Sequence, residues 1–264
     1  VGTVTAEMLD DEGLTYGIVG EAINGDIAGE LITTSGTLTG LFGADGAGSI
    51  GFAAMDGDTG KVGTETVTYD WDSGTNTLTA VSGTRGTIFT ILVTDPVTGD
   101  YTLTLNKAVL HESLDGLTGD NTENDATVAL TYTVTDGDGD EAEGTLNLSF
   151  DDDMPVFTSA ETGEVDNMIG ATFTGDLHFQ IGADQPVSGD ALSLLNNTPP
   201  TDLTSNGAAV HYYVNPANSD TLIAYTGTDP NIAANQVFTL TLNESTKTYD
   251  FTLLKTLDSV ELVD

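Results

Sequence analysis

The sequence ALTYTVTDGDGDEAEGTLNLSFDDDMP, residues 129–155, decides the fold prediction. Two runs of alternating apolar and polar residues flank an acidic loop that contains two glycines, and a second acidic cluster follows at residues 151–153. Alternation with a period of two is typical of half-buried β-strands, and Gly and Asp are turn-forming residues. The stretch therefore predicts two strands joined by an acidic turn, with carboxylates at both ends of the second strand.

Similar runs occupy most of the chain. Thr, Val, Tyr and Phe alternate within them, Gly, Asp, Asn and Ser separate them, and no window shows a convincing helical stripe. We expect an all-β protein of two tandem Ig-like or Greek-key β-sandwich domains. The strands expected in the first domain are residues 37–42, 66–71, 77–81, 87–93, 101–105, 127–135 and 145–150, with a hairpin turn at 95–100.

An internal repeat supports the division into two domains. Residues 36–45 (GTLTGLFGAD) align without a gap with residues 175–184 (GDLHFQIGAD). Residues 67–69, 89–93 and 101–107 likewise align with residues 210–212, 238–242 and 249–255. A repeat of about 140 residues has the size of a single domain. The expected boundaries are an acidic linker at 1–13, a first domain at 14–150, a second linker at 151–155 and a second domain at 156–264.

The second copy has no counterpart of residues 127–150. We therefore expect it to lack its last strands, which exposes a sheet edge and part of its core. Either the sequence stops inside a longer protein, or another domain is inserted after residue 264. The start at Val1 is likewise expected to lie inside a longer chain.

The charge of the chain is strongly negative. It has 42 Asp and Glu against 5 Lys and Arg, a formal net charge of -37. Nucleic acids and anionic membranes bind basic surfaces, so neither is an expected partner. No apolar run is long enough to insert into a membrane, and no signal peptide is evident. Because like charges oppose a compact state, divalent cations or high salt are expected to offset them.

The strongest local signal for a ligand is the loop with carboxylates on alternate residues, Asp136, Asp138 and Asp140. Calcium takes six to eight oxygen ligands, and such a loop can bring several to one ion. It is not an EF-hand, because Glu141 occupies the sixth loop position and Asn147 the twelfth. The alternative is a solvated hairpin tip. The other expected calcium ligands are Asp10, Asp11, Glu12, Asp151, Asp152 and Asp153.

The length of the last strand places these acids. Six residues, 145–150, span about 20 Å, so the loop and residues 151–153 are expected at opposite ends of the first domain. We expect the chain to enter at the loop's end, so that Asp10, Asp11 and Glu12 share calcium with the loop. Each linker would then bind calcium together with the loop of the following domain, and the site at residues 151–153 would be weaker.

The remaining polar residues give weaker signals. Asp56, Asp58 and residues 120–125 are expected in solvated loops, and Asp45 and Asp184 in turns. Trp71, Tyr69, Tyr212 and Tyr213 could form a sugar-stacking face, but alternating strand positions favour the core.

Signatures of an enzyme are missing from the sequence. His111, His178 and His211 are scattered and are expected to be surface or strand histidines. Residues 46–51 match a dinucleotide fingerprint by letters only, since no βαβ unit follows. With no cysteine, thiolate chemistry and disulfides are excluded. We expect no catalytic residue, no organic cofactor and no enzymatic activity.

Residues 134–140 (VTDGDGD), 144–146 (GTL) and 150–153 (FDDD), together with 43–49 (GADGAGS) and 101–107 (YTLTLNK), carry a family resemblance. The chain resembles extender domains, and in its second part a split extender domain, of giant RTX (repeats-in-toxin) adhesins that bacterial type I secretion systems export. The glycine-rich calcium nonapeptides of RTX proteins are not found in it.

The resemblance implies a calcium-stabilised structural segment on the bacterial cell surface. Such a segment extends or presents ligand-binding modules for cell adhesion and biofilm formation. Its partners would be neighbouring domains of the adhesin and, through adjacent modules, a host or surface glycan or peptide. The alternative is that these domains themselves bind carbohydrate or peptide in a calcium-dependent way; a fragment of a secreted hydrolase is a third, less favoured possibility.

Overall fold

The computed structural model describes residues 2–20, 29, 31–111, 125–183, 191–195 and 198–258. The chain divides into a first unit, Val1–Pro155 with Ile181–Gln185, and a second unit, Val156–Gln180 with Pro186–Asp264. The described residues form nineteen strands, three short 3-10 helices and no α-helix. The all-β prediction is therefore confirmed. None of the described helices could span a membrane.

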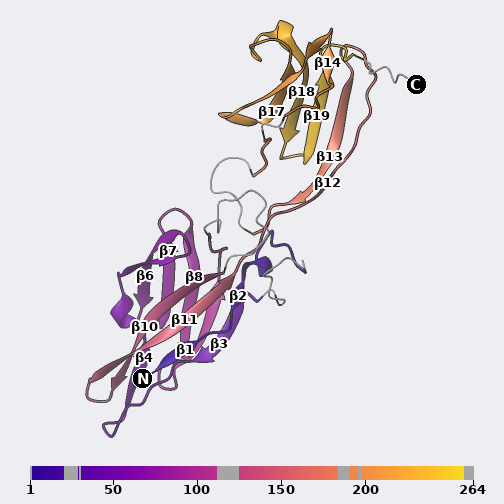
Figure 1. Cartoon of the computed structure of the whole chain (residues 1–264). Helices are drawn as coiled ribbons and strands as arrows, with labels where there is room; N and C mark the ends of the chain where they lie inside the picture. Colours follow the sequence, from indigo (N-terminus) through magenta and orange to yellow (C-terminus); the bar gives the residue numbers. More distant parts are fainter. Residues whose placement is uncertain are drawn as a thin grey trace. The chain divides into compact units, whose positions relative to one another are not determined.

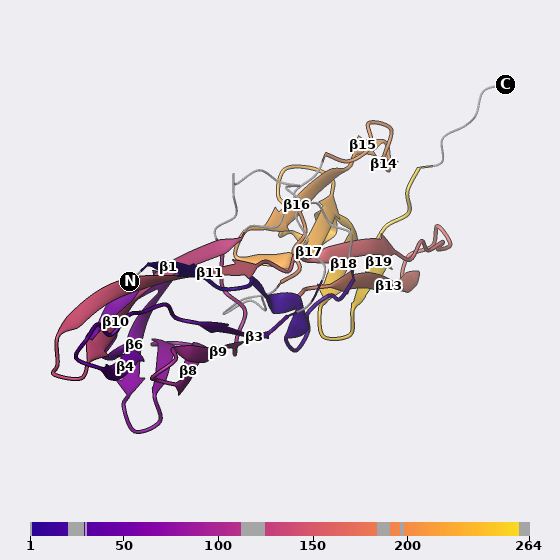
Figure 2. The ribbon, with the colours of Figure 1, turned by 90° about the horizontal axis from the view of Figure 1, so that it is seen from below.

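The first unit is a sandwich of two sheets (Figure 1). One sheet has the strand order β1-β11-β10-β4, and β2 also pairs with β11. β1 and β2 run parallel to β11, and β1 lies along β11 in both views (Figures 1 and 2). The strands are β1 (Thr3–Thr5), β2 (Leu9–Asp10), β4 (Ala47–Gly51), β10 (Ala126–Asp136) and β11 (Glu141–Asp151).

The other sheet of the first unit is antiparallel, in the order β3-β9-β8-β7-β6-β5. Its strands are β3 (Thr33–Thr37), β5 (Thr59–Val62), β6 (Glu65–Asp72), β7 (Thr77–Ser82), β8 (Gly86–Asp95) and β9 (Asp100–Leu105). Two 3-10 helices, η1 (Asp11–Gly13) and η2 (Ala53–Met55), belong to the same unit.

The core of the first unit lies between its two sheets. Alternate side chains of β8 and β10 point inward, so Phe89, Ile91, Leu130 and Tyr132 are fully buried. The rings of Phe89 and Phe150, one from each sheet, lie 5.7 Å apart. Burial of this apolar surface, at about 25 cal/mol per Å², is the main stabilising contribution to the sandwich.

The second unit contains one six-stranded sheet and a two-stranded ribbon among the described residues. The sheet order is β12-β13-β19-β18-β17-β16, and β14 pairs with β15. The elements are β12 (Val156–Ala160), β13 (Thr172–Gln180), β14 (Thr204–Ser205), β15 (Ala208–Ala209), β16 (His211–Asn215), β17 (Asn218–Tyr225), η3 (Ala233–Asn235), β18 (Gln236–Asn243) and β19 (Thr248–Leu253).

The six-stranded sheets of the two units share one pairing register. In the first unit a row of paired residues runs across four strands through Tyr69, Ala80, Phe89 and Leu105. The row at the aligned positions of the second unit is Tyr212, Ala224, Phe238 and Leu253. A register shift follows the alanine in both rows. The sequence repeat is therefore also a repeat of structure.

The six-stranded sheet of the second unit is less well buried than that of the first unit. Ile91 and Leu103 are 0% exposed in the first unit, whereas their counterparts Leu240 and Phe251 are only half-buried. The described residues of the second unit include no strand pair equivalent to β10 and β11. This agrees with the missing counterpart of residues 127–150 in the sequence.

Several predicted boundaries were wrong. Residues 1–13 are not a linker, because β1 and β2 are strands of the first unit, and that unit also includes residues 151–155. Strand β3 ends at Thr37 rather than continuing to residue 42, because the chain then runs close to β4 and β10 of the other sheet. There a Cβ at Gly40 would stand 2.6 Å from Val134.

Candidate metal centres

The parallel pairing of β2 with β11 brings two acidic segments together. Asp10 is the register partner of Asp151. Residues 11–12 directly follow Asp10, and residues 152–153 directly follow Asp151. After Asp10 the chain turns into η1, where the carboxylate of Asp10 accepts a hydrogen bond of 2.8 Å from the Glu12 amide. The first unit thus gathers two short acidic segments at the end of one strand.

All six carboxylates of this junction cluster are buried. The cluster comprises Asp10, Asp11, Glu12, Asp151, Asp152 and Asp153, and their exposed fractions range from 0% to 9%. Asp and Glu are almost never buried to this degree unless a cation or hydrogen bonds stabilise them. Carboxylate oxygens are the ligands that calcium prefers, so the residues present fit this ion.

Asp153 is held in place by backbone amides. Its Oδ2 accepts hydrogen bonds from the amides of Ala183, at 2.6 Å, and Ile18, at 3.1 Å. Its Oδ1 is buried and has no hydrogen-bond partner in the part of the chain that the structure describes. Burial raises the pKa of Asp153, and the nearby charges of Asp152 and Asp10 raise it further, although the two amides act in the opposite direction. Burial and the neighbouring negative charges therefore oppose the carboxylate form of Asp153, and a bound cation would act in its favour.

Gly17 allows the chain after η1 to turn back against the backbone of Glu12. A Cβ at residue 17 would lie 1.9 Å from the carbonyl oxygen of Glu12, so only glycine fits beside η1. The next residue, Ile18, donates the amide hydrogen bond to Asp153. The turn at Gly17 and Ile18 thus contacts both acidic segments, at Glu12 and at Asp153.

His111 also belongs to the junction. Its Nδ1 lies 3.0 Å from Oδ1 of Asp152, and both side chains are largely buried. The prediction of a surface or strand histidine was wrong at this position. No sequence spacing connects residue 111 with residue 152, so only the fold reveals the pair.

The second acidic group lies at the turn between β10 and β11. Ligand oxygens of Asp45, Asp136 and Asp138 lie within 4.8 Å of one another. Oδ1 of Asp136 accepts hydrogen bonds from the amides of Asp140, at 2.9 Å, and Gly139, at 3.1 Å. Burial acts to raise the pKa of Asp136, but hydrogen bonds from Asp138 and from backbone amides outweigh it and lower this pKa. Because the group is more exposed than the junction cluster, solvent screens it more strongly.

The loop and residues 151–153 lie at opposite ends of the first unit, as predicted, but the predicted position of Asp10, Asp11 and Glu12 beside the loop was wrong. Strand β11 begins at Glu141, next to the acidic turn, and ends at Asp151. Ten residue steps span about 34 Å, so the turn and the junction cluster lie at opposite ends of the strand. Asp10, Asp11 and Glu12 lie at the far end, with Asp151, because β1 and β2 run parallel to β11. They cannot share an ion with Asp136, Asp138 and Asp140.

The other candidates have ordinary roles where they are described. Asp56 accepts a hydrogen bond from the Trp71 amide, as a turn residue does. His178 and His211 are exposed strand residues, as predicted. Asp45, predicted in a turn, also approaches the acidic loop, which the repeat at Gly-Ala-Asp did not indicate. Asp184 and residues 120–124 lie outside the described residues.

Comparison with known proteins identifies a family for the first unit. Residues 18–149, half of the chain, match the family described as "Domain of unknown function (DUF5801)". The chain belongs to this family. No curated protein and no solved structure matches the chain. The matched DUF5801 segment begins after Asp10, Asp11 and Glu12 and ends before Asp151, so the junction cluster flanks both of its ends.

Proposed function

We propose that the chain is a calcium-stabilised, non-enzymatic structural segment of a large bacterial surface adhesin. It would extend or present ligand-binding modules outside the cell, for adhesion and biofilm formation. The observation that carries the calcium part is the burial of six carboxylates at one end of the first unit. The adhesin part is supported by the resemblance of the acidic loop and its flanking strands to RTX extender domains.

Electrostatics explain why calcium would stabilise this fold. Buried like charges repel one another, and desolvation disfavours the charged form of each carboxylate. A divalent cation bound by several of these oxygens replaces repulsion with attraction, and it binds only where the fold brings the ligands together. Calcium binding would therefore add directly to the free energy of unfolding.

A fold that depends on calcium would also suit export of the chain in an unfolded state. With a net charge of -37, the chain resists compaction at low calcium. Millimolar calcium outside the cell would then drive folding after secretion. Neighbouring domains of the same adhesin are its expected partners.

Calcium titration calorimetry on the full chain tests the metal part. We expect calcium binding that Asp10→Asn combined with Asp153→Asn weakens at least tenfold, because both carboxylates lie in the junction cluster. Asp70→Asn, an exposed strand position of the same unit, is the matched control and should leave affinity unchanged. Equal affinity in the double variant and the wild type would contradict the assignment.

Surface labelling tests the adhesin part separately. An antibody raised against this chain should label intact cells of the bacterium that encodes it, and deletion of the type I exporter should abolish the labelling. Labelling that requires cell lysis would contradict a surface location.

A further inference from the structure

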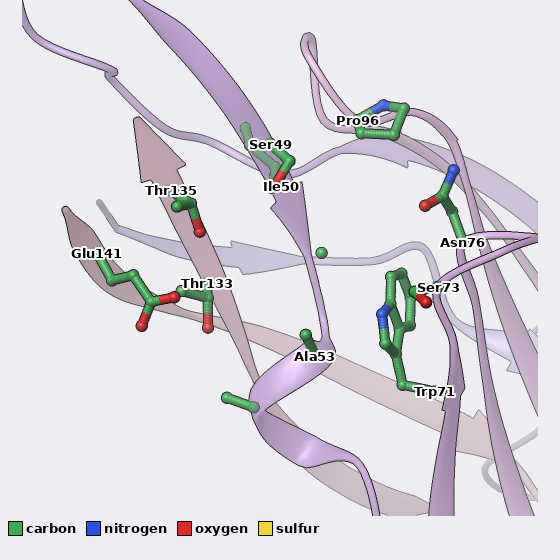
Figure 3. A pocket seen from close by; sticks show the side chains of 12 residues that line it. Ser49, Ile50, Ala53, Trp71, Ser73, Asn76, Pro96, Thr133, Thr135 and Glu141 are labelled. Atoms are coloured by element: carbon green, nitrogen blue, oxygen red, sulfur yellow. The ribbon is translucent and has the colours of Figure 1, made fainter. Parts of the chain in front are cut away.

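A groove of about 520 Å³ lies on the first unit, away from the junction cluster. It is bounded by β4, η2 and β6 and by the ends of β10 and β11 next to the acidic turn. Figure 3 shows Trp71, Asn76 and Pro96 on one side of it and Thr133, Thr135 and Glu141 on the other. One wall is thus aromatic and the other is polar.

The aromatic wall is held in a fixed orientation. Trp71 is half-buried and packs against Phe52, with ring centroids 6.0 Å apart and an interplanar angle of 57°. The edge of the indole lies over Gly51, where a Cβ would stand 3.0 Å from Cζ2. The glycine on β4 therefore provides the space that the ring occupies. Trp71 is also the single tryptophan of the chain.

The polar wall is built by strand register. Thr135 pairs with Glu141 on one side and with Ser49 on the other, and Thr133 pairs with Gly51. This places a carboxylate and hydroxyl groups on neighbouring strands along the groove.

The hydroxyl group of Thr133 is the strongest indication that the polar wall binds a ligand. It is only 7% exposed, and its Oγ1 has no hydrogen-bond partner within the described residues. A buried hydroxyl in this state costs about 1–3 kcal/mol. Because Oγ1 has almost no accessible surface, a ligand hydroxyl would recover this cost once the Thr133 side chain rotates toward the groove.

We propose that this groove binds a neutral saccharide. The apolar face of a sugar ring packs on an indole, and its hydroxyls exchange hydrogen bonds with Ser, Thr and Asn side chains. Glu141 is the single charged side chain among the lining residues, and the chain as a whole is strongly negative, so anionic sugars are repelled. The inference goes beyond the proposed calcium function, because none of the lining residues belongs to either acidic cluster.

The emission of Trp71 tests the proposal directly. The full chain, in calcium, is titrated with neutral tetrasaccharides of glucose, galactose, mannose and N-acetylglucosamine. We expect at least one to give a saturable change in emission. Sialyllactose and a trilysine peptide are titrated in parallel. No saturation with any neutral sugar, or saturation with trilysine or sialyllactose only, would overturn the proposal.

Two variants locate the binding site. Thr133→Val keeps the shape of the side chain but removes the hydroxyl, and it should weaken binding by about fivefold or more. Trp71→Phe removes the fluorescent reporter, so its affinity is measured by calorimetry. This variant should bind the sugar more weakly than Thr133→Val does. Thr68→Val is the matched control, since Thr68 is an exposed residue of β6 on the opposite face of the strand from Trp71. Unchanged affinity in Thr133→Val and Trp71→Phe would overturn the assignment of the groove.

Discussion

A glycine and a tyrosine face each other on neighbouring strands in both units. Gly36 pairs with Tyr101 and Gly175 with Tyr249. A Cβ at Gly36 would lie 2.7 Å from the hydroxyl oxygen of Tyr101, and one at Gly175 would lie 2.5 Å from the ring of Tyr249. The tyrosine ring thus covers the glycine and occupies the space that a side chain would take. This pair explains why the glycine recurs at the same position of the repeat.

Replacing this glycine should therefore destabilise the first unit. Gly36→Ala forces the methyl group into the ring of Tyr101, which is 2% exposed and cannot move away easily. We expect a loss of about 1–3 kcal/mol, typical of overpacking. Urea unfolding followed by Trp71 fluorescence measures it. Gly83→Ala, where a Cβ meets open space, is the control, and an equal effect of both changes would contradict the explanation.

The hydrogen bonds of Asp100 are expected to make the stability of the first unit depend on pH. Hydrogen bonds from Thr37, at 2.7 Å, and Thr98, at 2.8 Å, lower the pKa of its carboxyl group. Because the folded pKa lies below the unfolded value of about 3.9, this stabilisation is present above that pH and is lost as pH falls through the folded pKa. NMR titration should show the pKa of Asp100 rising in Thr37→Val. An unchanged pKa would contradict the role of Thr37.

At this scale the sequence predicted residue types better than residue partners. Alternation favoured the core for four aromatic residues; Tyr69 is buried, whereas Trp71, Tyr212 and Tyr213 are only half-buried. The pair of His111 with Asp152 and the approach of Asp45 to Asp136 were not predictable, because each joins segments that only the folded chain brings together.

Among the elements, β11 determines where the acids lie. Its eleven residues separate the acidic turn from the junction cluster by about 34 Å, several times the Debye length of about 8 Å at physiological salt. The two groups are therefore expected to bind cations independently.

Independence is measurable with a double-mutant cycle. Asp136→Asn with Asp138→Asn removes the turn group, and Asp10→Asn with Asp153→Asn disables the junction cluster. The losses in calcium-dependent stability should add within about 0.5 kcal/mol in the combined variant. Strong non-additivity would contradict independent binding at the two ends.

Long alternating strands were predictable, and short or glycine-rich ones were not. In the runs that became β6, β7, β8, β9 and β10, Thr residues alternate with apolar or aromatic residues. Strand β4, with the sequence AGSIG, has no such pattern; its Gly48 backbone lies so close to the carbonyl of Thr135 that a Cβ would be 2.2 Å away. β1 and β2 span three and two residues and form through parallel pairing with β11. The sequence did not indicate this pairing, so the prediction placed the chain entry at the wrong end of the unit.

For the whole molecule, charge is expected to control stability. The net charge of -37 creates repulsion that salt screens, since the Debye length falls from about 30 Å at 0.01 M to about 10 Å at 0.1 M. Adding NaCl should raise the Tm of the calcium-free protein and raise the Tm of the calcium-loaded protein less. Differential scanning calorimetry across this range measures both. A Tm that falls with salt in the calcium-free state would contradict the repulsion.

Thermal unfolding in millimolar calcium and in excess EDTA tests the central claim, that calcium at the junction cluster stabilises the first unit. Trp71 fluorescence reports on that unit alone, because the chain has one tryptophan. A site saturated at 100 times its Kd adds about 2.7 kcal/mol, and for a chain of this size each kcal/mol shifts Tm by about 2–4 °C. We predict that chelation lowers the Tm by about 5–10 °C for each calcium lost, and that the Asp10→Asn, Asp153→Asn variant shows a much smaller shift. The same Tm in calcium and in EDTA would contradict the claim.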